Sequence, residues 1–149
     1  MITSVRDVAV ATFAIAGATS AALALAARLE GARAVQPLNA TSHWLHGDRA
    51  ACKTAADARY TGVGAATHIA SSALWAGLFV WLRGIGRPRP VMFDAAAVTA
   101  AAAVVDYAVV PARLTPGWEH VVSKTSIAAA YAAMFAALVL TSADDDSWR

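Results

Sequence analysis

The sequence predicts an all-α fold, a four-helix transmembrane bundle with a short interfacial helix between the first and second spans. The first observation is composition: 58% of the 149 residues are hydrophobic and only 15% are charged, whereas a soluble domain carries about 25% charged residues. The second is patterning, because the charges lie between long apolar blocks in which alanine dominates. The third is length: the blocks approach the roughly 20 apolar residues that cross a bilayer. A backbone in lipid must satisfy its own hydrogen bonds, so these blocks should be helices.

Four segments meet this test, and together with the regions between them they make a single transmembrane domain, 1–149. The predicted spans are 8–27, 61–82, 91–110 and 125–141. None has the charged face at 3.6-residue spacing that is typical of a soluble helix. We expect the first span to be retained, because its apolar stretch is too long for the hydrophobic region of a typical signal peptide. An acidic tail, 142–149, follows the last span.

The connector between the first two spans, 28–60, is too long for a simple turn. Pro37 can open a short helix, and Asn39 is one of the residues that could cap one. Trp44 and Leu45 supply apolar contacts for such a helix. We therefore expect a helix that lies in the membrane interface over the mouth of the bundle.

Small and polar residues predict how the spans meet, because helices in lipid are held together by close backbone approach and side-chain hydrogen bonds. In the first span, Gly17 and Ala21 have the spacing of a small-residue packing motif. In the second span, four residues at i, i+3, i+4 and i+7 are expected to point into the bundle: His68, Ser71, Ser72 and Trp75. The simplest role of both faces is packing.

The short loop 83–90 predicts the orientation. It holds Arg83, Arg87 and Arg89 and no acidic residue, and basic residues in short loops favour the cytoplasm. The opposite side holds more basic residues in total, but several lie far from span ends or beside acids. We expect both termini to be cytoplasmic. Three tryptophans are expected as anchors at the headgroup level: Trp44, Trp81 and Trp118.

Six ionisable residues are predicted to face the same side of the membrane: His43, His46, His68, Asp106, Glu119 and His120. At ~1.5 Å of rise per residue, His68 and Asp106 should both lie roughly 6–10 Å inside the membrane. An ionised group at the centre of a span costs about 2.5–3.5 kcal/mol on insertion scales, so such groups usually find partners. We expect His68 and Asp106 to lie near each other, directly or through water, with Thr99 on the same inward face.

Three interpretations of these residues stay open. They could bind a ligand or relay protons, since imidazole titrates near physiological pH. They could hold a metal or haem through His43, His46 and His68, with Asp106 or Glu119 as a carboxylate ligand, although the spacing matches no recognised metal motif. They could also be structural pairs, in which Asp106 is bound to a histidine, to Arg113 or to a hydroxyl group.

Other features have simpler explanations. Asp94 suits the positive N-terminus of the third span, close to the arginine loop, and Arg113 suits a side chain that extends to the lipid headgroups. Cys52 is the only cysteine, so no internal disulfide forms. A net charge of +2, widely scattered, indicates no nucleic-acid surface. The common catalytic motifs of soluble enzymes are absent from the sequence.

Three stretches carry a likeness to a family: "PLNATSHWLHGDRAA", "THIASSALWAGLF" and "DYAVVPARLTPGWE". Together they resemble an uncharacterised group of small bacterial inner-membrane proteins with four spans. The most specific pieces are the SHW segment and the RLTPGWE turn. The resemblance implies a stand-alone membrane protein and carries over no catalytic residue.

The predicted function is that of a multi-pass membrane protein that binds a partner or a small ligand at its histidine-bearing face. The alternatives are a metal- or haem-binding redox or enzyme component, and a transporter or proton-relay subunit, which would require a homo-oligomer. A further alternative is an accessory subunit of a larger membrane complex. The sequence identifies no cofactor and does not decide whether the chain is an enzyme.

Overall fold

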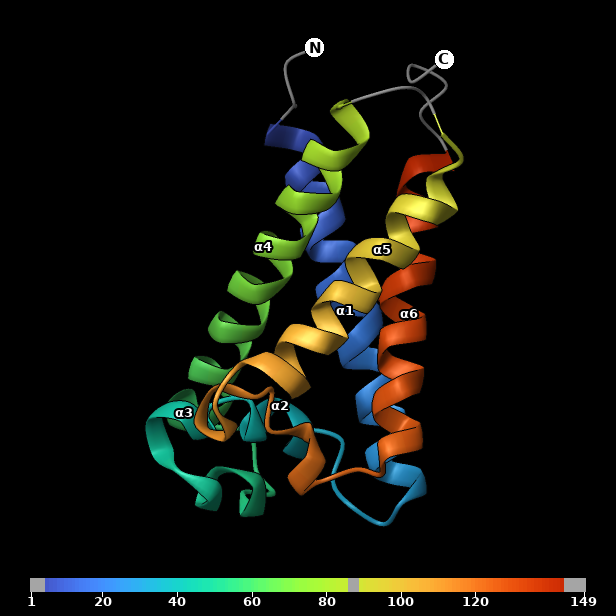
Figure 1. Cartoon of the computed structure of the whole chain (residues 1–149). Coiled ribbons are helices and arrows are strands. Elements are labelled where there is room, and N and C mark those ends of the chain that lie inside the picture. The colour runs from blue at the N-terminus through green and yellow to red at the C-terminus, as the bar shows by residue number, and fades with distance from the viewer. Residues whose placement is uncertain (1–4, 86–88, 144–149) are drawn as a thin grey trace.

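The computed structural model describes residues 5–85 and 89–143, and within these ranges every regular element is a helix (Figure 1). Four stretches are long and apolar enough to cross a membrane: Val5–Leu29, Ala58–Gly84, Val91–Val109 and Lys124–Ser142. The predicted all-helical fold with four candidate spans is therefore confirmed. The predicted spans agree with these limits to within three residues at each end. Arg87 and the last six residues of the acidic tail lie outside the described residues.

The first and last of these stretches are the α-helices α1 (Val5–Leu29) and α6 (Lys124–Ala143). The other two each contain a π-helical turn. The turn η2 (Ala58–Gly62) leads into α4 (Val63–Gly84), and α5 (Val91–Val104) continues into the turn η3 (Val105–Val109). Both π-helical turns therefore lie at the same end of the molecule, which we call the lower end.

The four long helices lie side by side in alternating directions, with α1 and α5 running toward the lower end and α4 and α6 running away from it (Figure 1). Helix α1 packs against α4 and α6, and α5 packs against the same two helices. The contacts rely on small side chains: Ala27, Ala76 and Ala130 are fully buried, beside Leu138 and Val98. Alanine allows close backbone approach between helices, which is how helices gain contact in lipid.

The small-residue pair of the first span does not take part in this packing, so that prediction was wrong. Gly17 and Ala21 are both exposed, and a methyl group added at Gly17 would meet nothing within 4 Å. The close approach occurs instead at Gly64, near the start of α4. A Cβ atom there would lie 1.9 Å from the carbonyl oxygen of Leu38 in the connector.

Two connectors cover the lower end (Figure 1). The first forms α2 (Gln36–Ala40), α3 (His43–His46) and a 3₁₀ turn, η1 (Asp48–Cys52). The second forms two 3₁₀ turns, η4 (Ala112–Leu114) and η5 (Trp118–His120). The predicted single helix of the first connector is thus two short helices separated by a turn.

Asn39 holds the first connector together instead of capping a helix. Its side chain is fully buried. Its amide nitrogen donates to the carbonyl oxygens of Lys53 and Ala55 at 2.8 and 3.1 Å, and its amide oxygen accepts a hydrogen bond from Thr61. One side chain therefore ties α2 to the segment that leads into η2.

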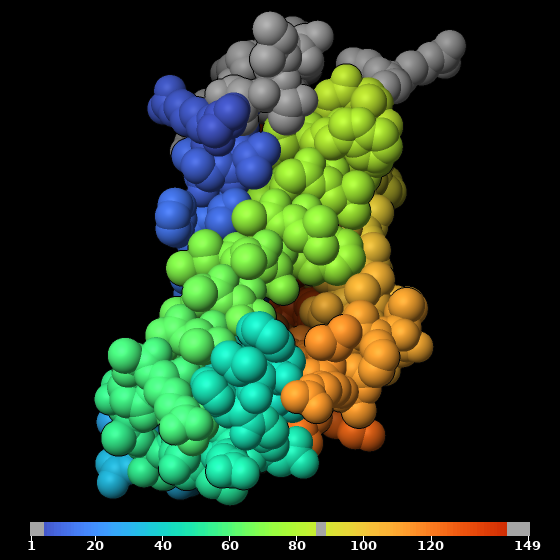
Figure 2. Space-filling view, turned by 90° about the vertical axis from the view of Figure 1, so that its left-hand side faces the viewer, coloured from blue at the N-terminus to red at the C-terminus, as the bar shows by residue number. Residues whose placement is uncertain are grey.

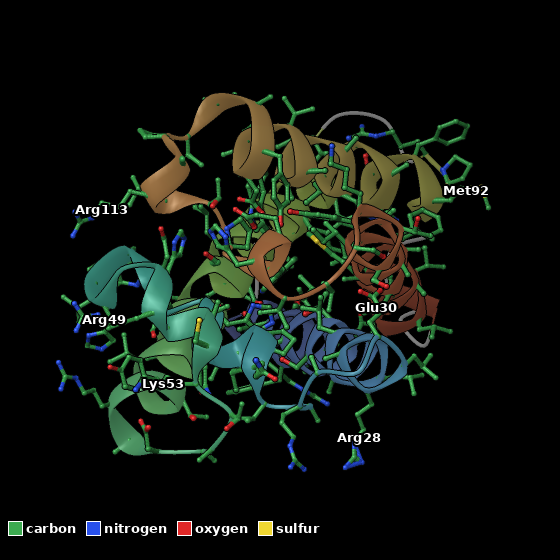
Figure 3. The ribbon with its side chains drawn as sticks, turned by 90° about the horizontal axis from the view of Figure 1, so that it is seen from below. Arg28, Glu30, Arg49, Lys53, Met92 and Arg113 are labelled. Atoms are coloured by element: carbon green, nitrogen blue, oxygen red, sulfur yellow. The ribbon has the colours of Figure 1, made fainter. Side chains whose placement is uncertain are left out.

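Charged side chains join neighbouring segments by hydrogen bonds at both ends of the molecule. Near the upper end Asp94 is 2% exposed and accepts hydrogen bonds from Arg83 at 3.0 Å and from Arg89 at 2.5 Å. At the lower end Glu30 turns toward α6, whereas basic side chains such as Arg28 point outward (Figure 3). Glu30 accepts hydrogen bonds from the backbone and hydroxyl of Ser123, at the start of α6.

Candidate functional site

A cavity of about 200 Å³ opens on the side of the molecule. Figure 2 shows it as a hollow between α4, the first connector and the segment after α5, with α6 visible at its floor. Most of its wall is apolar. The larger apolar side chains that line it include Ile15, Trp44, Trp75, Leu114, Trp118 and Met134.

Polar side chains from all four long helices also reach this cavity. Those placed inside the helical region include Thr19 on α1, His68, Ser71 and Ser72 on α4, Asp106 on η3 and Tyr131 on α6. Pockets that bind small molecules usually combine an apolar wall with a few convergent polar groups. The cavity has this character.

His68 is held against α1. Its side chain is 8% exposed, and Nε2 lies 2.9 Å from the hydroxyl oxygen of Thr19. The Thr19 hydroxyl group also lies 2.7 Å from the carbonyl oxygen of Ile15; with its single proton directed there, Nε2 of the imidazole is the donor to Thr19. Nδ1 of the neutral ring then keeps a lone pair. The ring also packs edge-on against Trp118, with centroids 5.8 Å apart.

Asp106 is held by α6. It accepts a hydrogen bond of 2.7 Å from the hydroxyl group of Tyr131. Its position in the π-helical turn η3 is notable, because π-helical turns are rare and frequently occur at functional sites. The sequence left a hydroxyl group open as one possible partner of Asp106 without naming it, and the structure identifies it as that of Tyr131. The available signal was that Tyr131 carries the one hydroxyl group in the interior of the predicted fourth span.

The structure thus lines one cavity with both His68 and Asp106, and each has its own partner rather than the other. Thr99 is not among the residues that line the cavity. Its buried hydroxyl oxygen has no hydrogen-bond partner among the described residues.

Glu119 and His46 lie outside the cavity. Glu119 is exposed and accepts hydrogen bonds from the hydroxyl groups of Tyr107, at 3.3 Å, and Thr115, at 2.5 Å. Nε2 of His46 donates to the carbonyl oxygen of Arg59 at 2.9 Å. Neither residue is therefore positioned to act on a molecule in the cavity.

Trp118 corrects another prediction. It was expected at the headgroup level, but its side chain is 6% exposed and its indole N–H donates to the hydroxyl oxygen of Thr41 at 3.1 Å. Gly117, with φ of 80°, directs the chain into this position. Trp44 and Trp81 are 38% and 53% exposed. Trp118 is part of the cavity wall.

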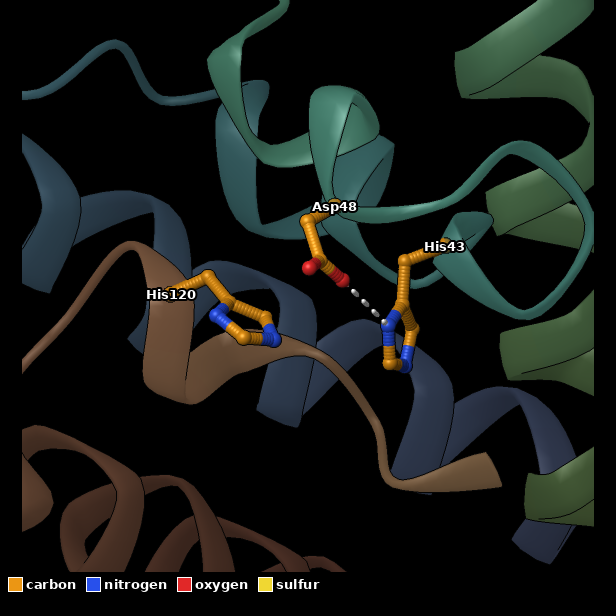
Figure 4. A group of neighbouring side chains, drawn as sticks. All are labelled: His43, Asp48 and His120. Atoms are coloured by element: carbon orange, nitrogen blue, oxygen red, sulfur yellow. Dashed lines mark ion pairs between the residues drawn. The ribbon is translucent and has the colours of Figure 1, made fainter. Parts of the chain in front are cut away.

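A second cluster lies at the lower end, where His43 and His120 face Asp48 (Figure 4). One potential ligand atom from each of the three residues lies within 4.8 Å of the others. This set differs from the predicted metal ligands. His43 belongs to it, but His46 is bonded to Arg59 and His68 to Thr19. The structure therefore does not bring the three predicted histidines together.

The two sites share one structural link. Nε2 of His43 donates to the carbonyl oxygen of Thr115 at 2.8 Å, and Thr115 lines the cavity. Arg113 donates from Nε to the carbonyl oxygen of Trp44 at 2.9 Å, which adds a second tie between the two connectors.

Comparison of the chain with family models, with curated proteins and with solved structures finds no match. The geometry and chemistry of these side chains are therefore the basis on which a function is proposed.

Proposed function

We propose that this chain is a multi-pass protein of the bacterial inner membrane that binds a small lipid-soluble molecule with a polar head. The binding site is the cavity lined by His68, Asp106 and Tyr131. The single observation that carries the proposal is that this cavity opens on the side of the helical bundle. Its wall is mostly apolar, and polar groups lie inside it within the helical region.

The proposed membrane placement follows from charge and exposure. The four long helices cross the bilayer as a bundle, and α2 and α3 lie in the interface at the lower end. Arg83 and Arg89, at the upper end, favour the cytoplasmic side, so both chain ends are cytoplasmic. Trp81, which is 53% exposed near the upper end of α4, suits the opposite headgroup level from Trp44.

The size of the cavity indicates the size of the bound group. A cavity of about 150 Å³ inside a soluble protein can hold benzene, so about 200 Å³ holds one ring or a head of similar volume. Aromatic side chains at Trp44, Trp75 and Trp118 give such a ring extensive contact at little entropic cost, because their rotamers are few.

Asp106 adds a chemical reason to expect a ligand in this cavity. Ionisable residues inside a membrane are costly and commonly mark substrate or ion paths. A carboxylate can accept about four hydrogen bonds, and among the residues that the structure describes one side chain donates to Asp106, through the Tyr131 hydroxyl group. The remaining capacity, together with the lone pair on Nδ1 of His68, suits a ligand head that donates hydrogen bonds, such as a hydroxyl group.

The opening suits entry from the lipid. Leu74, Val104 and Leu114 are 66%, 54% and 57% exposed on the elements that border it. Trp44 donates from its indole N–H to the hydroxyl oxygen of Thr67 at 3.0 Å. This hydrogen bond joins α3 to α4 at the rim. A lipid-soluble molecule could therefore enter sideways without crossing the connectors.

Transport by a single chain has less support. Toward the upper end the hydrophobic core includes Ala11, Phe79, Val80 and Leu138, and the buried carboxylate there, Asp94, is bound to Arg83 and Arg89. A polar path across the membrane would therefore have to form between copies of the chain.

The test uses a brominated phenol as a probe of stated chemistry, with the protein in lipid nanodiscs. Its heavy atom quenches tryptophan fluorescence, and three tryptophans line the cavity. We expect saturable quenching in the parent protein. Ser71→Phe, which places a ring at an exposed lining position, should weaken binding at least tenfold.

Ala70→Phe is the matched control, because Ala70 is also exposed on α4 but does not line the cavity. Asp106→Asn should also weaken binding by about tenfold or more, because hydrogen bonds to charged groups contribute about 1.5–3 kcal/mol. Quenching that is not saturable, or that is the same in Ser71→Phe and the parent, would refute the proposed site.

A further inference from the structure

We propose that His43, Asp48 and His120 form a binding site for a divalent transition cation, with Zn²⁺ as the best-suited ion. The site lies at the lower end of the molecule, and its chemistry is independent of what occupies the cavity. Two imidazole nitrogens and one carboxylate oxygen form a donor set that suits zinc, with water at the fourth position.

Two glycines in the left-handed region of backbone space bring these residues together. Gly47, with φ of 71°, follows α3 and turns the chain so that Asp48 faces back toward His43. Gly117, with φ of 80°, presses the second connector against the first. A Cβ atom there would lie 2.5 Å from the carbonyl oxygen of Ala40, so only glycine permits this approach. The turn η5 then places His120 beside His43.

His43 is already oriented as a metal ligand. Its side chain is 3% exposed, and its Nε2 can only donate to the carbonyl oxygen of Thr115, because that oxygen has no proton. When the ring carries a single proton, that proton is on Nε2, and the lone pair of Nδ1 faces Asp48. Histidines that bind metals almost always donate their other ring N–H to a carbonyl or carboxylate group, which fixes the tautomer. His43 has this second contact.

The remaining two ligands can adjust to an ion. Nδ1 of His43 and Oδ1 of Asp48 are 3.9 Å apart, and the His43 and His120 ring centroids are 5.6 Å apart. Bonds of about 2.0–2.1 Å in a tetrahedral site place ligand atoms about 3.4 Å from each other. The side chain of Asp48 is 86% exposed and His120 is also exposed, so rotation of surface side chains can close this difference.

A bound ion would join the two connectors at residues far apart in the sequence. Because a cation that binds the folded state stabilises it by mass action, Zn²⁺ should raise the thermal midpoint of the protein. It should also stiffen the segment around Thr115, which borders the cavity.

The experiment measures Zn²⁺ binding by calorimetry, and the absorption spectrum of Co²⁺ as a substitute ion, on tag-free protein stripped with chelator. It uses a Cys52→Ser background, because Cys52 is an exposed thiol on η1 that could itself bind zinc. We expect about one ion per chain. Asp48→Asn and His120→Ala should each weaken binding at least about tenfold, since even the outer partners of a metal ligand are worth about 10–100-fold.

His46→Ala is the matched control, because it removes a histidine of the same connector that faces Arg59 instead of the cluster. It should leave the affinity unchanged, and Zn²⁺ should still raise its thermal midpoint, whereas His120→Ala should lose that rise. The proposal is overturned if the background protein binds no Zn²⁺, or if His46→Ala weakens binding as much as His120→Ala does. Failure of this test would leave the cavity proposal standing, because the phenol probe involves none of the three ligands.

Discussion

The contact at Gly64 gives a sharp test of how the first connector is docked. Gly64→Ala adds a Cβ atom at a point where it would lie 1.9 Å from the carbonyl oxygen of Leu38. Ordinary contact begins at about 3.4 Å, so α2 and α4 must separate by about 1.5 Å. The obstacle is backbone, which cannot rotate away as a side chain could. We therefore expect α2 to be displaced from α4.

The expected change in the free energy of unfolding of Gly64→Ala is the sum of two opposing effects. Overpacking a tight contact costs typically 1–3 kcal/mol, and a backbone obstacle places this site at the upper end. Replacing glycine by alanine inside a helix contributes about 1 kcal/mol in the opposite direction. Gly64→Ala should therefore destabilise the protein by about 2 kcal/mol.

The matched control is Gly77→Ala on the same helix. A Cβ atom at Gly77 would meet nothing within 4 Å, so this variant should be neutral or up to about 1 kcal/mol more stable. Unfolding in mixed micelles of rising denaturing-detergent content, followed by circular dichroism, gives both free energies. Trypsin should also cut the connector of Gly64→Ala faster, at exposed basic residues such as Arg49 and Lys53 (Figure 3). If Gly64→Ala and Gly77→Ala proved equally stable and equally resistant to trypsin, α2 would not be docked as described.

Two further predictions concern the charged residues that bind neighbouring segments at the two ends of the molecule. Asp94→Asn removes the negative charge that Arg83 and Arg89 share, and breaking a buried ion pair costs about 3–5 kcal/mol. Because the Arg89 side chain is 36% exposed, we expect a loss of stability near the lower limit of that range. The same unfolding measurement checks it, and an unchanged free energy of unfolding would contradict a stabilising role of this ion pair. Hydrogen bonds to the Glu30 carboxylate, of which the one from Ser126 has the largest effect, lower the pKa of Glu30 below its ordinary value. The ionised carboxylate therefore stabilises the folded protein fully at neutral pH, and this contribution is lost as the pH falls through the lowered pKa. Unfolding of the parent and Glu30→Gln at a series of pH values should therefore give a stability difference that disappears in acid, and a difference independent of pH would refute this.

The two proposed sites bear on each other through the second connector. Thr115 borders the cavity and accepts the hydrogen bond that orients His43. A cation on His43 would hold this segment in place, and a ligand in the cavity would press on the same segment. Measuring phenol binding with and without Zn²⁺ would show whether the two sites are coupled.

The sequence by itself determined the number and the limits of the long helices. Apolar length and the concentration of charge between blocks are local properties, and a bilayer imposes the same length on each span. It also indicated that His68 and Asp106 lie at similar depth, because rise per residue fixes depth along a helix. Both residues line one cavity as a result.

Only the tertiary structure decided which side chains meet. The partner of a residue depends on the rotation of each helix about its axis and on the path of the connectors, and neither is a local property. Thus Gly17 has the spacing of a packing motif but faces outward, and Tyr131 rather than His68 binds Asp106. His120 joins His43 because Gly117 allows the backbone to press against Ala40. That contact depends on two segments that come together only in the folded chain.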